Sequence, residues 1–112
     1  MNSLKPALTK LGIWFREKAH TESELLRLAE ANNGWFTIES VSKSFQSHGD
    51  SLREEQIDKW FEAYDLPDAI HADSGKRIGI IMAGNLPLVG LHDMLCALVS
   101  GHKVAVKTSR DD

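Results

Sequence analysis

The last third of the chain constrains the fold most, because two short apolar runs flank one apolar segment of helical length. The run 78–83 leads through a Gly-Asn-Leu-Pro turn into the apolar segment 88–99, and a second run, 104–106, follows a glycine. This order predicts a strand, a helix and a second, parallel strand, which together form one βαβ unit. The first run is almost continuous, as is typical of a strand buried on both faces of a parallel sheet.

The front of the chain carries the start signals of four helices. Leucine and phenylalanine recur at spacings of three and four up to about Lys18, which predicts an amphipathic first helix with Asn2 or Ser3 as its N-cap. The patterns 21–24 (Thr-Glu-Ser-Glu) and 51–54 (Ser-Leu-Arg-Glu) are capping boxes, so they predict the starts of the second and fourth helices. Thr37 is predicted to cap the third.

Glycine and proline predict where these helices end. Asn-Asn-Gly at 32–34 is typical of a left-handed stop, Ser-His-Gly at 47–49 predicts the end of the third helix, and Leu66-Pro67 must follow the end of the fourth. The predicted parts are a segment of about four helices over 1–66, a linker over 67–75, and the βαβ unit over 76–112.

The predicted fold class is therefore α/β, with a helical N-terminal segment followed by an incomplete βαβ unit. Two parallel strands and one helix do not make a stable sheet, since open sheets have more strands and both faces covered. The segment 88–99 is apolar nearly all round, so it requires protein on more than one side. We expect the chain to be the front end of a larger protein.

Charge and cysteine usage narrow the functional classes. Residues 1–74 carry 8 Lys and Arg against 13 Asp and Glu, whereas residues 75–112 carry 5 against 3. An acidic front argues against a nucleic-acid-binding module, and the mildly basic end suits a small anionic ligand. One cysteine, no signal-peptide pattern and an apolar run broken by His92 and Asp93 lead us to expect a cytoplasmic protein without a membrane span.

Ligands of open α/β sheets bind at the carboxyl ends of the strands, where the turn after the first strand lies. Gly84 allows a ligand to approach the backbone, and the Asn85 amide is a neutral donor for a developing oxyanion. The second strand delivers Lys107 to the same edge. Neither a G-x-G-x-x-G fingerprint nor a P-loop is present, so from spacing alone a purely structural turn is an equal alternative.

These residues resemble the LuxC-type acyl-CoA reductases, the fatty-acid reductase component of bacterial luminescence that other bacteria also possess. The resemblance rests on Ile80-Ile-Met-Ala-Gly-Asn-Leu-Pro-Leu-Val-Gly-Leu-His-Asp93 and Ser100-Gly-His-Lys-Val-Ala-Val-Lys-Thr-Ser109. Asn33-Gly-Trp-Phe-Thr37 and Lys59-Trp-Phe-Glu-Ala-Tyr64 are similar to the helical front of that family, so the resemblance covers most of the chain.

The family belongs to the aldehyde dehydrogenase-like superfamily, which implies that the βαβ unit opens a Rossmann-type, NADP-binding domain. The implied activity is NADPH-dependent reduction of a fatty acyl-CoA or acyl-protein thioester to a fatty aldehyde, through a cysteine thiolate that takes the acyl group. That cysteine lies beyond residue 112 in the family, so the chain alone is expected to be inactive. Acyl-protein synthetase and acyltransferase subunits are the implied partners.

The resemblance also assigns roles to the turn and to the end of the second strand. Asn85 matches the donor to the thiohemiacetal oxyanion, and Lys107 matches a lysine that binds the adenosine ribose. Ser109 and Arg110 stand where a ribose-binding glutamate often lies, which suits a 2′-phosphate and favours NADP over NAD. The residues implied to bind the cofactor are Met82, Ala83, Gly84, Lys107, Ser109 and Arg110.

The remaining reactive side chains are expected to be structural. Cys96 lies in the middle of an apolar helix without a neighbouring base, so we interpret it as a buried, inert thiol. His92-Asp93 are adjacent in a helix and do not face each other, which argues against a catalytic dyad. His71-Ala-Asp73 is a surface loop rather than a metal site, and no metal is predicted.

Two other hypotheses stay open at this point. The apolar segment 88–99 could dock a partner protein, which would make the chain a small non-enzymatic interaction module. The chain could also be a stand-alone nucleotide binder that depends on Lys107.

Overall fold

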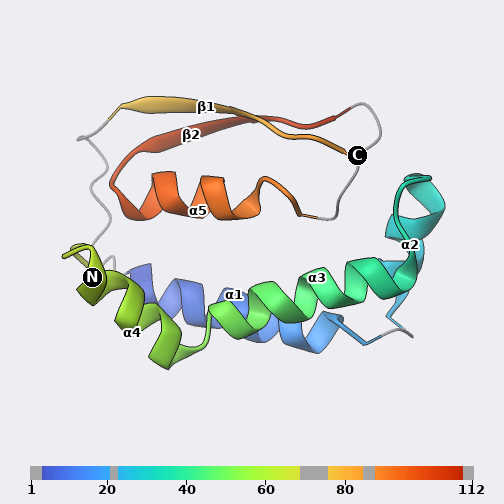
Figure 1. Cartoon of the computed structure of the whole chain (residues 1–112), viewed down its shortest axis with the longest axis horizontal. Helices are drawn as coiled ribbons and strands as arrows, with labels where there is room; N and C mark the ends of the chain where they lie inside the picture. The colour runs from blue at the N-terminus through green and yellow to red at the C-terminus, as the bar shows by residue number, and fades with distance from the viewer. Residues whose placement is uncertain (1–3, 21–22, 69–75, 85–87, 110–112) are drawn as a thin grey trace.

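The structure, a computed structural model, describes residues 4–20, 23–68, 76–84 and 88–109. Two parallel strands form one outer layer, a short helix lies beneath them, and two longer helices lie beneath that helix (Figure 1). The elements are α1 (Leu4–Lys18), α2 (Glu24–Asn32), α3 (Ile38–Ser51), α4 (Glu54–Ala63), β1 (Arg77–Ile81), α5 (Leu91–Val99) and β2 (Lys103–Lys107). The predicted order of four helices followed by a βαβ unit is confirmed.

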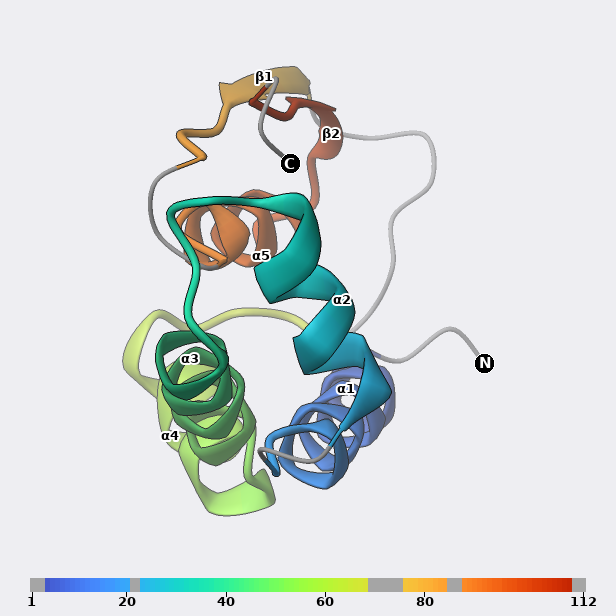
Figure 2. The same cartoon turned by 90° about the vertical axis from the view of Figure 1, so that its right-hand side faces the viewer.

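The two strands pair in parallel, as predicted. Their register runs from Arg77 opposite Lys103 to Ile81 opposite Lys107. A parallel pair requires a crossover, and α5 provides it by packing against both strands. Seen end-on, α5 lies between the strands and the helices α1, α3 and α4 (Figure 2).

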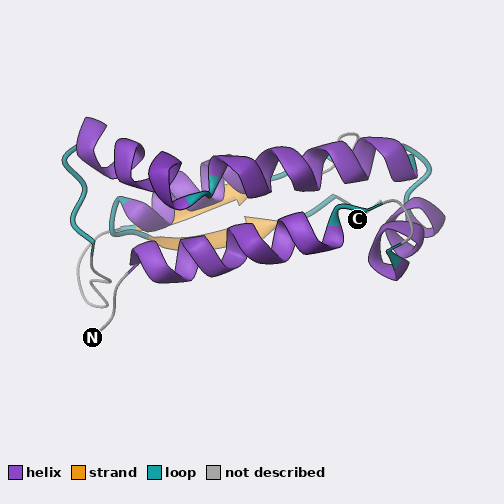
Figure 3. Cartoon of the chain, turned by 90° about the horizontal axis from the view of Figure 1, so that it is seen from below, coloured by secondary structure: helices purple, strands orange, loops and turns teal. Residues whose placement is uncertain are grey.

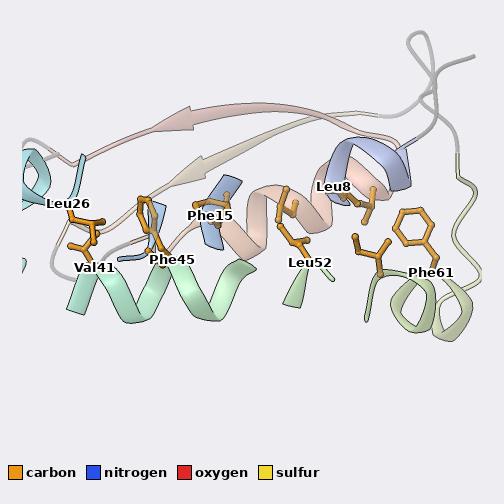
Figure 4. Packing of buried hydrophobic residues seen from close by; sticks show 12 residues of the cluster. Leu8, Phe15, Leu26, Val41, Phe45, Leu52 and Phe61 are labelled. Carbon is orange, nitrogen blue, oxygen red and sulfur yellow. The ribbon is translucent and has the colours of Figure 1, made fainter. Parts of the chain in front are cut away.

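The apolar core lies between the helical front and α5. Phe15 of α1 meets Phe45 of α3, and their rings pack edge to face with centroids 5.2 Å apart (Figure 4). Leu8 lies at one end of the cluster near Leu52 and Phe61, and Val41 lies at the other end beside Leu26. From α5, the same cluster contains Leu91, Leu95 and Val99. The all-round apolar character of this helix is explained by its position, since both of its sides are covered.

Helices α1 and α3 lie side by side and approach closely (Figure 3). A Cβ atom on Gly12 would lie 2.7 Å from the Leu52 carbonyl oxygen, and one on Gly49 would lie 3.1 Å from the Gly12 carbonyl oxygen. The prediction that Gly49 stops α3 is wrong, because the helix continues to Ser51. This glycine instead allows α1 to come near.

Two further cap predictions are wrong. Helix α2 has Ser23 as its N-cap rather than Thr21, which lies outside the described residues, and α4 has Arg53 rather than Ser51. Ser51 is the last residue of α3, where its hydroxyl donates to the His48 carbonyl oxygen at 2.9 Å. Because Ser51 still belongs to α3, its backbone lacks the extended conformation of an N-cap, which Arg53 adopts instead.

Other helix ends follow the sequence. Thr37 caps α3, in a box whose second member is Ser40. Helix α4 ends at Ala63, before Leu66-Pro67, with Asp65 in the left-handed region at φ 50°. The expected N-caps of α1, Asn2 and Ser3, lie outside the described residues. Asp68 accepts hydrogen bonds from the first two amides of α1 at 2.8 and 2.7 Å, which satisfies two donors at this helix end.

The strands are covered on one face only within the described residues. Along β1, half-buried and exposed residues alternate, and the Ile81 side chain is 88% exposed. Burial of the first strand on both faces is therefore not observed.

The close contact between α1 and α3 predicts a cost for enlarging Gly12. We expect Gly12→Ala to lower the free energy of unfolding by about 1–3 kcal/mol, because the new methyl group meets backbone that must shift. In the matched control, Gly34→Ala, the new methyl group meets no atom within 4 Å, so a change within about 0.5 kcal/mol is expected. Urea unfolding followed by circular dichroism measures both. Equal effects of the two substitutions would contradict the close packing.

Candidate functional site

The carboxyl ends of β1 and β2 form the edge where the sequence places a ligand. Because Ile81 pairs with Lys107, the residues after each strand lie next to each other. The Met82 amide extends the ladder by donating to the Lys107 carbonyl oxygen at 2.9 Å. The turn after β1 and the end of β2 therefore meet at one edge, as predicted.

The predicted site residues at this edge differ in burial. Met82 and Ser109 are half-buried, Gly84 is buried, and Ala83 and Lys107 are exposed. The Lys107 ammonium group contacts the backbone carbonyl oxygen of Thr108 at 2.9 Å. Asn85 and Arg110 lie outside the described residues, so the structure places neither of them.

The Asn33 side chain holds the backbone of the turn after β1, a role that the Asn-Asn-Gly pattern at 32–34 does not predict. Asn33 is 3% exposed, and its Nδ2 atom donates to the Gly84 carbonyl oxygen at 3.0 Å. Its Oδ1 atom accepts from the Trp35 amide at 2.9 Å. Its backbone is extended at φ −138°, so the predicted left-handed stop is wrong. Asn33 instead joins the end of α2 to the turn that follows β1.

A cavity of about 300 Å³ opens beside this edge. Residues of α2 and α3 line it on one side, and residues of the β1–α5 connection line it on the other. Its described lining consists of Leu25, Ala29, Phe36, Val41, Phe45, Met82, Ala83, Leu88, Val89, Gly90 and Thr108. Phe45 is buried in the core and Phe36 packs against it, and both also form part of the cavity wall.

A second hollow contains the only cysteine of the chain. Cys96 is half-buried, and its Sγ atom lies 3.4 Å from Nε2 of His92, one helical turn earlier. The prediction that Cys96 has no neighbouring base is therefore wrong. Burial, followed by the negative charge of Asp93, raises the pKa of the Cys96 thiol, which disfavours the nucleophilic thiolate.

His92 is held by packing rather than by its neighbour Asp93. Its ring stacks on Trp60 of α4, with centroids 6.1 Å apart and an interplanar angle of 26°. This contact agrees with the structural interpretation of the His92-Asp93 pair.

The segment 71–73 lies outside the described residues, and the part of the chain that the structure describes contains no cluster of three or more His, Cys, Asp or Glu side chains able to hold a metal ion.

His48 of α3 lies in the interface between the helical front and α5. Its ring is 6.0 Å from that of Phe15. Burial and the nearby His92 lower the pKa of His48, whereas a hydrogen bond with the Leu88 backbone opposes this shift. The neutral ring is thus the form that suits this interface.

No family model, no curated protein and no solved structure matches this chain. The resemblance to LuxC-type acyl-CoA reductases therefore stays a prediction. Among the described residues, no helix combines the length and the apolar character needed to cross a bilayer.

The buried hydrogen bonds of Asn33 predict that its side chain stabilises the turn. We expect Asn33→Ala to lower the free energy of unfolding by about 1–3 kcal/mol, because the substitution deprives the Gly84 carbonyl and the Trp35 amide of their partner. Its exposed neighbour provides the control, and Asn32→Ala is expected to change stability by less than about 0.5 kcal/mol. Chemical unfolding measures both, and hydrogen exchange at the Trp35 amide should accelerate only in Asn33→Ala.

The lowered pKa of His48 predicts a pH dependence of stability. As the pH falls below the ordinary histidine value of 6.5, the unfolded chain takes up a proton that the folded chain binds less readily, so stability decreases. Above this pH both states are neutral at His48, and its contribution to the dependence vanishes. Unfolding measured between pH 7.5 and pH 5.5, a range of about one unit on either side of the ordinary value, should show a smaller loss in His48→Gln than in the unmodified chain. An identical slope would contradict the assignment.

Proposed function

We propose that this chain is the N-terminal part of an NADPH-dependent long-chain acyl-CoA reductase, which forms a fatty aldehyde from a fatty acyl thioester. The observation that carries the proposal is the meeting of the Gly84 turn with the end of β2, joined by the hydrogen bond from Met82 to Lys107. Ligands of open α/β sheets bind at this edge. The exposed Lys107 ammonium group has only a neighbouring backbone carbonyl as its described partner, so it fits the ribose or phosphate oxygens of a dinucleotide.

In this proposal the residues of the chain bind and orient, and the nucleophile comes from elsewhere in the parent protein. Asn85 donates a hydrogen bond to the oxyanion that develops from the thioester carbonyl. Lys107 holds the ribose, while Ser109 and Arg110 favour the 2′-phosphate of NADP. When bound, NADPH supplies the hydride. The parent's cysteine would receive the acyl group while coenzyme A or the acyl-protein leaves as its thiol. It would be released as the free thiol once the acyl group has taken up the hydride and the sulfur a proton, as the aldehyde leaves.

Exposed apolar surface on the strands also supports a larger parent. Ile81 is 88% exposed and Val106 is 39% exposed, whereas strands of a parallel sheet are normally covered on both faces. Further strands and helices of the parent would cover these side chains.

The alternative, an interaction module that docks through the segment 88–99, has less surface available than the sequence suggested. Helix α5 buries Leu91, Leu95, Ala97 and Val99 within the chain. Val89 and Leu98 remain exposed along this segment. Since most of its apolar groups are already covered, the enzyme hypothesis is the better supported of the two.

The proposal predicts binding of NADPH that depends on Lys107. We expect calorimetry to detect NADPH binding to the chain, and Lys107→Ala to weaken it about tenfold or more, because a charged hydrogen bond contributes about 1.5–3 kcal/mol. Lys103→Ala is the matched control, since Lys103 lies at the opposite end of the same strand, and it should bind like the unmodified chain.

A second assay tests the reaction itself. The parent protein should form a fatty aldehyde from NADPH and a long-chain acyl-CoA, and the isolated chain should not. Aldehyde formation by the isolated chain, or none by an intact parent, would overturn the proposal.

A further inference from the structure

Helix α5 carries a thiol and an imidazole one helical turn apart, next to α4. The Sγ atom of Cys96 and the Nε2 atom of His92 lie 3.4 Å apart. A spacing of four places both side chains on one face of the helix, and two helical histidines at the same spacing bind zinc in metalloproteases. Sulfur of cysteine and nitrogen of histidine are the preferred zinc ligands. The pair therefore has the composition of half a zinc site.

The distance between the two atoms fits tetrahedral coordination. Bonds from zinc to sulfur and to imidazole nitrogen are about 2.3 Å and 2.0–2.1 Å long. With these bond lengths, two ligand atoms 3.4 Å apart form an angle of about 100° at the metal, close to the tetrahedral angle of about 109°. One cation can therefore bind both atoms at the separation that the structure shows.

The surroundings orient the imidazole and leave space beside the pair. The His92 ring stacks on Trp60, with an interplanar angle of 26°, and such support from neighbouring residues raises the affinity of a metal site. The hollow next to the pair has a volume of about 510 Å³. Since a water molecule occupies about 30 Å³, the hollow has room for two waters that complete a tetrahedral shell.

The electrostatics of this face favour a cation. Cys96 lies in the last turn of α5, where the carbonyl ends of the helix carry partial negative charge. The negative charge of Asp93 also acts on the Cys96 thiol. Neither lysine nor arginine is among the described residues that line the hollow. These observations are independent of the distance between sulfur and nitrogen, and they point to the same kind of ligand.

We infer that His92 and Cys96 together bind a zinc ion, with water at the two remaining positions. When the ion binds, the S–H bond of Cys96 breaks, its proton passes to solvent, and a Zn–S bond forms. Nε2 of His92 provides a lone pair, so the ring proton stays on Nδ1. The described residues provide no third side-chain ligand, so the ion is exchangeable rather than enclosed.

This site is separate from the edge assigned to the cofactor. None of the described residues that line the hollow also lines the cavity beside the strand edge. Zinc binding at α5 is therefore independent of whether the parent protein reduces an acyl thioester.

A cobalt titration of the reduced chain, without an affinity tag, tests the site. Cobalt bound to a thiolate gives a sulfur-to-metal charge-transfer absorption, which should rise to saturation. Zinc should abolish this absorption, because it binds such ligands more tightly than cobalt. Magnesium should not, since it prefers oxygen ligands. Absence of a saturable band up to about 1 mM cobalt would overturn the inference.

Substitutions of the two ligands assign the band to this pair. Cys96→Ser should abolish the band, and His92→Gln should weaken zinc binding about tenfold or more, since even loss of a supporting residue costs about 10–100-fold. His20→Gln removes an exposed histidine elsewhere and should bind like the unmodified chain. Equal zinc affinities of the unmodified chain and His92→Gln, or equal losses in His92→Gln and His20→Gln, would contradict the site.

A ligand exchange separates coordination from a structural role of the thiol. Cys96→His keeps two ligands at a spacing of four, so it should still bind zinc but show no charge-transfer band. Zinc should raise the melting temperature of the unmodified chain and of Cys96→His, but not that of Cys96→Ser. An equal rise in all three would show that zinc binds elsewhere on the chain.

Discussion

The structure depends on the burial of α5 between the strands and the helical front. Two parallel strands have too little apolar surface to be stable alone, and their connection requires a helix that packs back on them. Leu91, Leu95 and Val99 join that helix to the core formed by α1, α3 and α4. The sheet is therefore attached to the helical front through one helix that is covered on both sides. The sequence predicts the helical front and the βαβ unit as separate parts, but in the structure they share a single core.

The hydrogen bond from Asn33 to Gly84 fixes the position of the turn relative to the helical front. The Asn33 side chain is buried and spans from the end of α2 to the Gly84 carbonyl, so it defines how far the turn stands from the helices. An apolar contact tolerates sliding, whereas a buried amide loses its hydrogen bond after a small displacement. The front therefore belongs to the candidate site itself, because it fixes the turn that follows β1 and lines the cavity beside it.

The order and type of the elements could be predicted because they follow from apolar periodicity, which each segment carries in its own residues. Helix ends were less predictable where a tertiary contact competes with a local signal. Gly49 has the residue type of a helix stop, but the approach of α1 gives it a different role inside α3. The contact of Asn33 with Gly84 joins residues 51 positions apart, and no local pattern indicates it. The His92–Cys96 contact is different, since a spacing of four on a helix already places both side chains on one face.

The geometry of the strand edge connects the proposed chemistry to the cavity. Met82 and Ala83 line the cavity and are also implied to bind the cofactor, and Thr108 of the lining lies between Lys107 and Ser109 in sequence. Cys96 lies in a separate hollow with Trp60 and His92, and its raised pKa disfavours the thiolate. In the proposed function this edge would bind and orient a thioester, and Cys96 would not be the nucleophile.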